Sequence, residues 1–336
     1  MKKDIGVGII GLKAGSDLLA INDEYDSRMR VIAVCDSHAA FARKVAERSQ
    51  IPFVTTDPFD LLSQPGVDLV VVLGHEAERY TYSMSALSAG KHVLCGSPMA
   101  TRLDDALELS KESSRTSSKL FVTNPSRWHP DVEAVRSLQA NGDLGEVRVV
   151  ESQVVSETTE SDGSSSHNES AMCDPLDLLR WVGGDITEVH GVGYCGDMLV
   201  NVRFEGGQIG RVMSLSGSVT PSPSNVSLGV YGSKGSYVNG QLVLNRIAGR
   251  PAMTFAATSA VHTEIPLVRC ALHFEAHLCD GAPLLTDTWD GAKTVAVCHA
   301  LRNSLATGAP VQVPVVDSNS VAIAKKAARG GASVEG

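Results

Sequence analysis

The stretch VGIIGLKAGSDLL, residues 7–19, decides the fold class. An apolar run typical of a buried strand ends in a glycine, and a helical pattern begins at once, which is the context of a dinucleotide-binding turn. Gly11 fills the first position of the pattern G-x-G-x-x-G. Lys13 and Ser16 stand at the second and third positions, and Gly15 lies one residue early. The stretch predicts a Rossmann-type turn in which the Lys13 ammonium either binds a pyrophosphate or obstructs it.

A second apolar run, RVIAVCD at residues 30–36, ends in Asp36. A carboxylate at this place accepts hydrogen bonds from both ribose hydroxyls of NAD and repels the 2′-phosphate of NADP. We therefore expect NAD as the cofactor, with NADP as an open alternative and an empty or altered site as another. The expected cofactor-binding residues are Gly11, Lys13, Ala14, Gly15, Asp36, Leu73, Gly74, Ser97 and Pro98.

Strands and helices alternate in the N-terminal third of the chain. Apolar runs predict five strands, at residues 5–10, 30–36, 68–74, 92–95 and 120–123. The intervening stretches show helical spacing, and the first helix is expected to run to about Tyr25. The alternation predicts βαβ units in a doubly wound parallel sheet, and hence an α/β dinucleotide-binding Rossmann domain over residues 1–123.

Beyond the predicted first domain, the pattern changes to long alternating strands. The segments EVRVVESQVVSET, MLVNVRFEGG and VSLGVYGSKGSYV alternate apolar and polar residues, and helices are predicted over residues 174–184 and 289–308. A polar, serine-rich segment at residues 158–170 is predicted to be a loop. We expect an α+β domain with a mostly antiparallel sheet over residues 124–316, followed by a loosely ordered tail over residues 317–336.

The composition excludes several classes of protein. The 336 residues are 43% hydrophobic and 20% charged, as in a soluble globular protein. The net charge of −9 argues against a surface that binds nucleic acid. No apolar run reaches the roughly 18 residues of a transmembrane helix, and the short, glycine-interrupted run near the N-terminus is typical of a strand rather than a signal peptide. We expect neither nucleic acid nor a membrane as a partner.

Seven cysteines are scattered along the chain without a C-x-x-C pair. An odd, dispersed count is typical of reduced thiols in the cytoplasm, and most of these cysteines are expected to be small buried residues. His273 and His277 stand four residues apart with Glu275 between them, but as a zinc pair they lack an identifiable third ligand. We therefore expect a cytoplasmic protein without a metal site.

The segment ALSAGKHVLCGSPMATRLDDALEL, residues 86–109, resembles the motif A-L-x-A-G-K-H-V-x-x-E-K-P-x-A of the Gfo/Idh/MocA oxidoreductases. GDLGEV at 142–147, DLLRWVGG at 177–184 and VYGSKGSY at 230–237 extend the resemblance over nearly the whole chain. It implies a Rossmann domain followed by a domain with a large open-faced sheet. It also implies a homodimer or homotetramer formed through that sheet, a nicotinamide cofactor and a carbohydrate-like substrate.

The chain departs from the family at its first catalytic motif. The family's E-K-P is Gly96-Ser97-Pro98 here, so that a serine replaces the lysine close to the chemistry. Ser97 can donate one hydrogen bond to a substrate oxygen or to the nicotinamide ribose, but it cannot stabilise a developing alkoxide as an ammonium does. The alternative is that Ser97 simply fills the turn. The family's usual histidine near the third predicted strand aligns near Arg79.

The second catalytic motif, D-x-x-x-H-x-x-D, aligns with residues 170–177. Asp174 stands where the family has its acid/base histidine, and only Asp177 matches. The pKa of a carboxyl group, ordinarily near 3.9, must rise by about three units for acid/base work near neutral pH. Asp177 is a like-charged neighbour that could raise the pKa of Asp174. The alternative places Asp174 at the N-cap of the following helix.

Further polar residues are candidates for the site. His167, in the predicted loop, is either a second candidate acid/base or a solvated loop residue. Arg127 and His129 align with a region that often lines the substrate pocket in the family, which makes them candidate substrate contacts. The candidate catalytic residues are thus Asp174, Asp177, His167 and Ser97.

Three functions follow from the altered motifs. The first is an NAD(P)-dependent oxidoreductase that acts on a sugar, cyclitol or related polyol with a rearranged acid/base set. The second is a catalytically silent relative that binds a dinucleotide or a sugar and serves as a regulator or scaffold. The third is a lyase or hydrolase that uses transient oxidation without net redox change. We favour the oxidoreductase.

Overall fold

The computed structural model describes residues 4–156, 172–216, 226–244, 253–256 and 265–317. The chain forms two compact units. The first unit holds the described residues up to Thr123 together with Leu267–Ala296 and the described residues from Val315 on. The second holds those of Asn124–Pro266 together with Val297–Pro314. The predicted second domain, residues 124–316, differs from this unit because one C-terminal helix and half of another pack against the first sheet.

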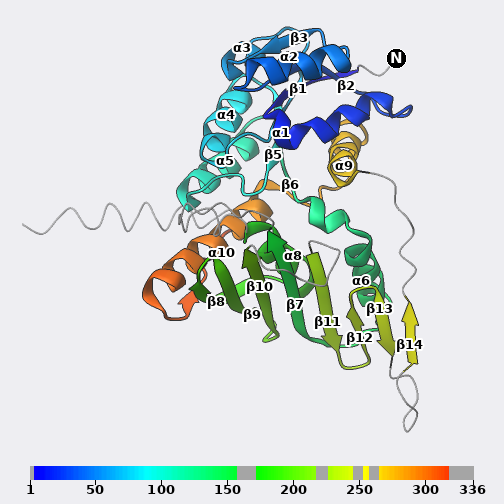
Figure 1. Ribbon diagram of the computed structural model, residues 1–336, viewed down its shortest axis with the longest axis vertical. Coiled ribbons are helices and arrows are strands. Elements are labelled where there is room, and N and C mark those ends of the chain that lie inside the picture. Colours follow the sequence, from blue (N-terminus) through cyan, green and yellow to red (C-terminus); the bar gives the residue numbers. More distant parts are fainter. Residues whose placement is uncertain (1–3, 157–171, 217–225, 245–252, 257–264, 318–336) are drawn as a thin grey trace, which may run out of the picture. The chain divides into compact units, whose positions relative to one another are not determined.

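The first unit is built on a six-stranded parallel sheet (Figure 1). Its strands are β1 (Ile5–Ile10), β2 (Met29–Cys35), β3 (Phe53–Thr55), β4 (Leu69–Val72), β5 (His92–Gly96) and β6 (Leu120–Thr123). They lie in the order β3-β2-β1-β4-β5-β6 with parallel pairs, which confirms the predicted doubly wound sheet. Only β3 was not predicted, because three residues are too few to show a strand pattern.

The stretch after β1 differs from the predicted α-helix to about Tyr25. The structure has a four-residue α-helix, α1 (Leu12–Gly15), followed by a 3₁₀ helix, η1 (Ser16–Asp23). The buried residues of the stretch recur at every third position, namely Leu12, Gly15, Leu18 and Ile21. A 3₁₀ helix has three residues per turn, so side chains at this spacing share one face and reach the core together.

The other helices that pack with this unit are α2 (Ala39–Arg48), α3 (Pro58–Leu62), α4 (Glu76–Ser88), α5 (Leu103–Arg115), α9 (Pro266–Asp280) and the first half of α10 (Thr288–Thr307). Helix α9 was not predicted from the sequence. The buried carboxylate of Glu275 holds this helix to the residues just before β2. Glu275 accepts hydrogen bonds from Ser27 Oγ at 2.7 Å and from Arg28 N at 3.0 Å. Phe274 of α9 also stacks on Phe121 of β6, with 5.5 Å between ring centroids. These contacts bring α9 back to the first sheet.

The second unit is built on a sheet that has nine strands in the described residues. They are β7 (Val147–Ser156), β8 (Ile186–Tyr194), β9 (Asp197–Phe204), β10 (Ile209–Ser216), β11 (Val226–Gly232), β12 (Gly235–Val238), β13 (Gln241–Leu244), β14 (Met253–Ala256) and β15 (Val311–Gln312). Their order is β14-β13-β12-β11-β7-β10-β9-β8-β15. Among the described pairs only β7 and β10 run parallel, so the sheet is mostly antiparallel, as predicted.

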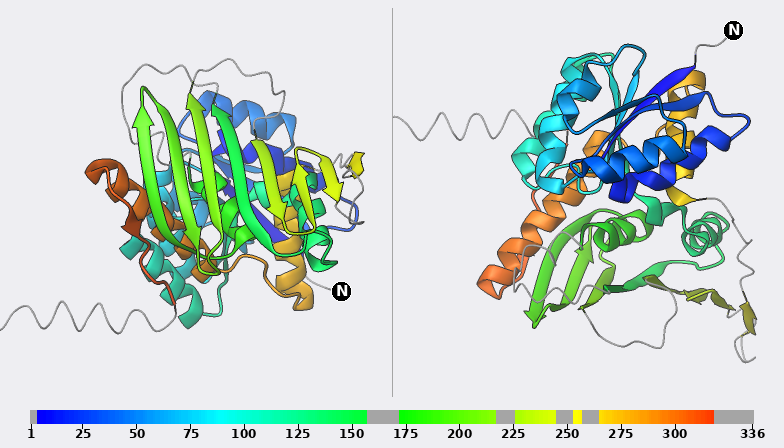
Figure 2. Two further views of the ribbon diagram at one scale, coloured as in Figure 1. Left: turned by 90° about the horizontal axis from the view of Figure 1, so that it is seen from below. Right: turned by 45° about the horizontal axis from the view of Figure 1, so that its top comes forward.

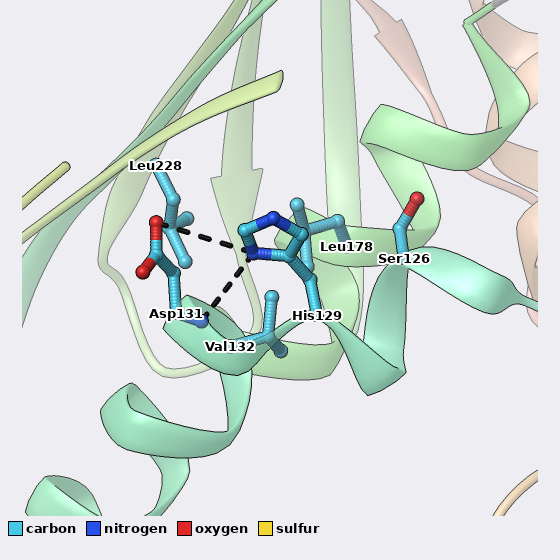
Figure 3. A pocket seen from close by; sticks show the side chains of 6 residues that line it. All are labelled: Ser126, His129, Asp131, Val132, Leu178 and Leu228. Atoms are coloured by element: carbon cyan, nitrogen blue, oxygen red, sulfur yellow. Dashed lines mark hydrogen bonds and ion pairs between the residues drawn. The ribbon is translucent and has the colours of Figure 1, made fainter. Parts of the chain in front are cut away.

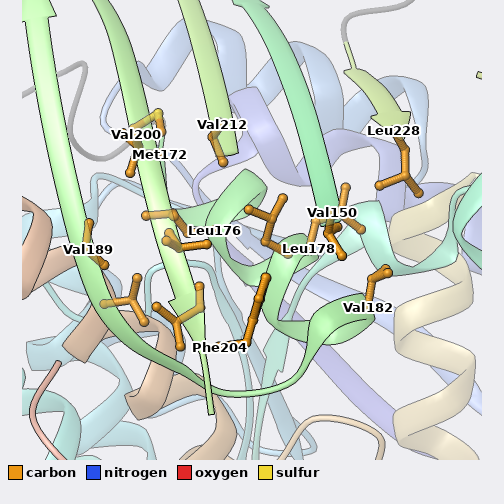
Figure 4. Close-up of a cluster of buried hydrophobic side chains, with 14 of the residues drawn as sticks. Val150, Met172, Leu176, Leu178, Val182, Val189, Val200, Phe204, Val212 and Leu228 are labelled. Carbon is orange, nitrogen blue, oxygen red and sulfur yellow. The ribbon is translucent and has the colours of Figure 1, made fainter. Parts of the chain in front are cut away.

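One face of this sheet carries the core of the unit. Along β9, Met198, Val200, Val202 and Phe204 are buried, and the residues between them are exposed. The helices η2 (Pro125–Trp128), α6 (Pro130–Ala140) and α8 (Cys173–Gly183) belong to the same unit. Figure 4 shows Leu176 and Leu178 of α8 among the buried side chains of the strands.

The opposite face of the sheet is open. The left panel of Figure 2 looks on to this face, which no described helix of the second unit covers. Leu199 of β9 and Ile209 of β10 are about half exposed there, at 53% and 51%. Within the described residues, no helix of either unit combines the length and the apolar character needed to cross a membrane.

Candidate functional site

The turn after β1 meets the end of β4 at very close range. Gly11 has a φ of 93°, a left-handed conformation that glycine adopts without strain. A Cβ atom placed on Gly11 would lie 2.4 Å from the backbone N of Gly74, so only a hydrogen atom fits there. Leu73 N also donates to the carbonyl of Ile10 at 2.9 Å. The ends of β1 and β4 therefore form one edge, at the point where the strand order reverses and such sheets bind ligands.

Gly15 takes the packing role of the last glycine in the fingerprint, one residue early. A Cβ atom on Gly15 would lie 2.7 Å from Cγ2 of Ile9, so this glycine lets the helical stretch approach β1 closely. Lys13 and Ala14 are exposed, and Ser16 is half-buried. Lys13 therefore does not fill the turn, and its role toward a pyrophosphate stays a prediction.

Asp36 joins the end of β2 to the same turn. One of its carboxylate oxygens accepts a hydrogen bond from Leu12 N at 2.9 Å, and the other accepts one from His38 N at 3.0 Å. The side chain is 10% exposed, and carboxylate oxygens have lone pairs for further hydrogen bonds. A glycine turn with an acidic residue at the end of the second strand fits the pyrophosphate and ribose of a dinucleotide.

Arg79 of α4 bridges the ends of β4 and β5 at the altered E-K-P segment. Its Nε donates to Gly74 O at 3.2 Å, and its Nη1 donates to Pro98 O at 3.0 Å. A Cβ atom on Gly96 would lie 3.1 Å from Cζ of Arg79, so a larger residue there would crowd the guanidinium. Ser97 itself is half-buried. A permanent positive charge thus lies beside the segment that lacks the family's lysine, although a guanidinium cannot act as a base near neutral pH.

Arg127 and Asp177 form a buried ion pair in the second unit. Arg127 Nε and Nη2 donate to the two carboxylate oxygens of Asp177, both at 2.6 Å, and the side chains are 4% and 1% exposed. The guanidinium lies 4.4 Å from the ring centroid of Trp181. Arg180 Nη1 is 3.7 Å from the same carboxylate. From the sequence, Arg127 and Asp177 were expected to have separate roles, but the structure pairs them. The positive charges of Arg127 and Arg180 both lie at the Asp177 carboxylate.

Asp174 lies half-buried in the first turn of α8. The helix begins at Cys173 with Met172 at the N-cap, so the alternative interpretation of Asp174 as the N-cap is wrong by two residues. The expectation rested on Pro175, but a proline is tolerated in the first turn of a helix, so its place does not fix which residue is the N-cap. A carboxylate in the first turn still interacts favourably with the helix dipole. His167 lies outside the described residues.

His129 lines a pocket of the second unit (Figure 3). The other lining residues are Ser126, Asp131, Val132, Leu178 and Leu228. His129 Nδ1 accepts a hydrogen bond from Asp131 N at 3.3 Å and so caps α6. Tyr237 Oη donates to Asp131 at 2.8 Å, and burial, together with this hydrogen bond, raises the pKa of Tyr237 above its ordinary value. Sequence reasoning missed Asp131 and Tyr237, because only the fold brings these distant positions together.

The histidines of α9 make contacts within the first unit. His273 Nε2 accepts a hydrogen bond from Leu285 N at 3.1 Å, and burial lowers the pKa of His273. His277 Nδ1 donates to Ala282 O at 2.6 Å. Both carboxylate oxygens of Glu275 accept hydrogen bonds from Ser27 and Arg28, just before β2. In the part of the chain that the structure describes, no group of three or more His, Cys, Asp or Glu side chains could hold a metal ion.

The parallel sheet, the Gly11 turn and Asp36 define a Rossmann-type dinucleotide-binding unit. Residues 5–124 match the Gfo/Idh/MocA family model, described as an oxidoreductase family with an NAD-binding Rossmann fold. The uncharacterized oxidoreductase YrbE of Bacillus subtilis is 24% identical over 255 residues, which are 70% of this chain and 74% of that protein. The inositol 2-dehydrogenase of Gluconacetobacter diazotrophicus is 28% identical over 185 residues, which are 53% and 54% of the two chains.

A solved structure extends the likeness in fold beyond the matched residues. Levoglucosan dehydrogenase in complex with NADH has a TM-score of 0.81 at 16% identity, covering 94% of this chain and 100% of that one. Residues 5–124 therefore form the NAD-binding Rossmann domain of the Gfo/Idh/MocA oxidoreductase family. The chain spans about three quarters of the length of YrbE and about half of the length of the inositol dehydrogenase.

Replacing Gly11 by alanine is expected to cost more stability than replacing Gly90. Both glycines have a positive φ, 93° and 76°, so each substitution costs about 1–2 kcal/mol of backbone strain. Only at Gly11 would the new methyl group strike backbone atoms, which adds about 1–3 kcal/mol. Urea unfolding of the two variants measures the difference. Equal costs would contradict the close contact between Gly11 and Gly74.

Asp177→Asn is expected to lower the free energy of unfolding by about 3–5 kcal/mol, because it removes the charge that compensates the buried Arg127. Arg127→Met should cost a similar amount, and the double variant Arg127→Met, Asp177→Leu should cost less than the sum. Arg102→Met is the control, since Arg102 is 70% exposed in its ion pair with Asp104 and exposed pairs contribute little. Denaturant unfolding that shows additive losses would rule out the coupling.

Proposed function

We propose that the protein is an NAD-dependent oxidoreductase that oxidises a hydroxyl group of a sugar, cyclitol or related polyol. The observation that carries this proposal is the Gly11 turn with Asp36 hydrogen-bonded to it, at the edge where the strand order of a parallel sheet reverses. The relatives support the substrate class, because one is named an inositol 2-dehydrogenase and another a D-glucoside 3-dehydrogenase.

The proposed cofactor site runs along the ends of β1, β2, β4 and β5. Asp36 would accept hydrogen bonds from ribose hydroxyls and repel a 2′-phosphate, which favours NAD over NADP. When bound, the nicotinamide supplies the chemistry of a hydride acceptor. We assign the remaining cofactor contacts to Gly11, Lys13, Ala14, Gly15, Leu73, Gly74, Ser97 and Pro98.

Asp174 is our proposed acid/base residue. It stands at the family's histidine position and lies half-buried in the first turn of α8. A positioned acid/base contributes about 10²–10⁴ in rate. His167 is the alternative. We propose that Ser97 donates a hydrogen bond to the substrate oxygen and that Arg79 supplies the positive charge of the absent lysine.

Arg127, expected as a substrate contact, and Asp177, expected as a catalytic residue, are both buried in their ion pair, so we assign them positioning roles instead. Their bidentate ion pair ties η2 to α8, and η2 carries Ser126 at the wall of the pocket. Arg127 therefore influences substrate contact through the placement of η2. His129 and Asp131 are the proposed direct contacts, because the hydroxyl groups of a polyol pair well with imidazole and carboxylate groups.

We further propose a homodimer or homotetramer in the cytoplasm, formed through the open face of the second sheet. Exposed apolar side chains gather on two neighbouring strands of this sheet, where Val192 of β8 pairs with Leu199 of β9 and Tyr194 follows two residues along β8. Such clusters are typical of protein interaction surfaces. The dispersed cysteines support a reducing compartment. Sedimentation velocity that finds only a monomer would contradict the assembly.

Cofactor binding and turnover test the proposed activity. NAD⁺ or NADH at about 100 times its Kd is expected to stabilise the protein against heat by about 2.7 kcal/mol, and NADP⁺ or NADPH by less. Asp36→Asn, which keeps an acceptor for Leu12 N but loses the charge, should reduce this preference. In a panel of sugars, cyclitols and polyols, we expect at least one to reduce NAD⁺. With that substrate, Asp174→Asn should lower kcat by about 10²–10⁴.

The control for turnover is Asp104→Asn, because Asp104 has a side chain that is 84% exposed and should leave kcat unchanged. No stabilisation by any of the four nucleotides would overturn the cofactor site. Bound nucleotide without turnover of any compound in the panel would leave a silent binding protein. Product without accumulation of NADH would instead identify a lyase or hydrolase that uses transient oxidation.

A further inference from the structure

Two cysteines of the second unit lie in contact although they are far apart in the chain. Cys173 begins α8, Cys298 lies in α10, and their Sγ atoms are 2.7 Å apart. An S–S bond is about 2.05 Å long, so a small movement separates this contact from a covalent link. The two positions are 125 residues apart and belong to no C-x-x-C pair, so the sequence pattern does not reveal the contact.

The two thiols differ in their access to solvent. Cys173 is 3% exposed and directly follows the fully buried core residue Met172. Cys298 is half-buried and packs at the margin of the hydrophobic core of the second unit. A small oxidant from solvent therefore meets Cys298 first, and Cys173 lies in position to react with the oxidised sulfur.

We propose that Cys173 and Cys298 form a reversible disulfide when the protein meets hydrogen peroxide. The Cys298 thiolate attacks one oxygen, the O–O bond breaks, and the departing hydroxide takes up a proton to leave as water, which gives a sulfenic acid. The Cys173 thiolate then attacks the Cys298 sulfur, the S–O bond breaks, and the departing hydroxide takes up the proton that Cys173 lost and leaves as a second water. Two thiols and one peroxide thus give one disulfide and two waters, and a small thiol reduces the link again.

The link ties the first turn of α8 to α10. Cys173 directly precedes Asp174, so the oxidised state restrains the residue that we propose as the acid/base. That consequence rests on the proposed function, whereas formation of the disulfide does not. A cytoplasmic disulfide is typically transient and redox-sensing, which suits a contact that peroxide closes and a thiol opens.

Peptide mapping of the full chain tests the proposal. The protein is treated with hydrogen peroxide, remaining thiols are alkylated, and the digest is analysed by mass spectrometry without reduction. We expect a cross-linked peptide that joins Cys173 to Cys298, about 2 Da lighter than the two thiol peptides together, and lost after dithiothreitol. Because the link closes a long chain segment, the oxidised protein should also unfold at least about 3 °C higher than the reduced protein.

Cys298→Ser is expected to abolish both the cross-link and the temperature shift. Cys279→Ser, which changes another half-buried cysteine, should alter neither. If Cys298→Ser fails to fold, the presence or absence of the Cys173–Cys298 peptide in the digest of the oxidised wild-type protein tests the proposal by itself. Recovery of both cysteines as alkylated thiols or as separate sulfinic acids overturns the proposal, as does a link from Cys298 to the exposed Cys195 in place of Cys173.

Discussion

The close approach of the Gly11 turn to Gly74 is the constraint on which the first unit and its site depend. Only a hydrogen atom fits between the two backbones, so the ends of β1 and β4 are held together without any side chain. Asp36 adds the end of β2 through Leu12 N, and Arg79 adds the end of β5 through two carbonyl groups. Each of these contacts ends on a backbone group of the edge. Neither Lys13 nor Ser16 takes part in them, so lysine and serine at two fingerprint positions leave the turn intact.

Charge in the second unit is organised around one buried carboxylate. Asp177 is the only residue that matches the family's second catalytic motif, and it pairs in bidentate geometry with Arg127 beneath the surface. Loss of either partner leaves a buried charge without its counter-charge, which is far costlier than loss of an exposed pair. Asp177 therefore has a structural role, which is to compensate the charge of the buried Arg127. A second close contact lies at the altered E-K-P segment, where a Cβ atom on Gly96 would lie 3.1 Å from Cζ of Arg79.

Patterns in the sequence predicted the type of most elements but not all of their details. The apolar runs of β1, β2, β4, β5 and β6 are long enough to show their period, whereas three-residue β3 is not. The buried positions after Gly11 recur at a spacing of three, a signal for the 3₁₀ helix that a search for the α-helical period overlooks. The helix α9 was missed, although its buried residues Leu267, Val268, Ala271 and Phe274 follow helical spacing.

The sequence by itself determined the parallel Rossmann sheet, the glycine turn after β1 and the acidic end of β2, because each depends on a local period or a local backbone preference. The tertiary structure alone decided which distant side chains meet. Arg127 pairs with Asp177 across 50 positions, Tyr237 with Asp131 across 106, and Cys173 with Cys298 across 125. Such contacts depend on how whole helices and strands pack, and no local pattern carries that information. Arg127 and Asp177 were therefore visible in the sequence as separate candidates, but their pairing was not.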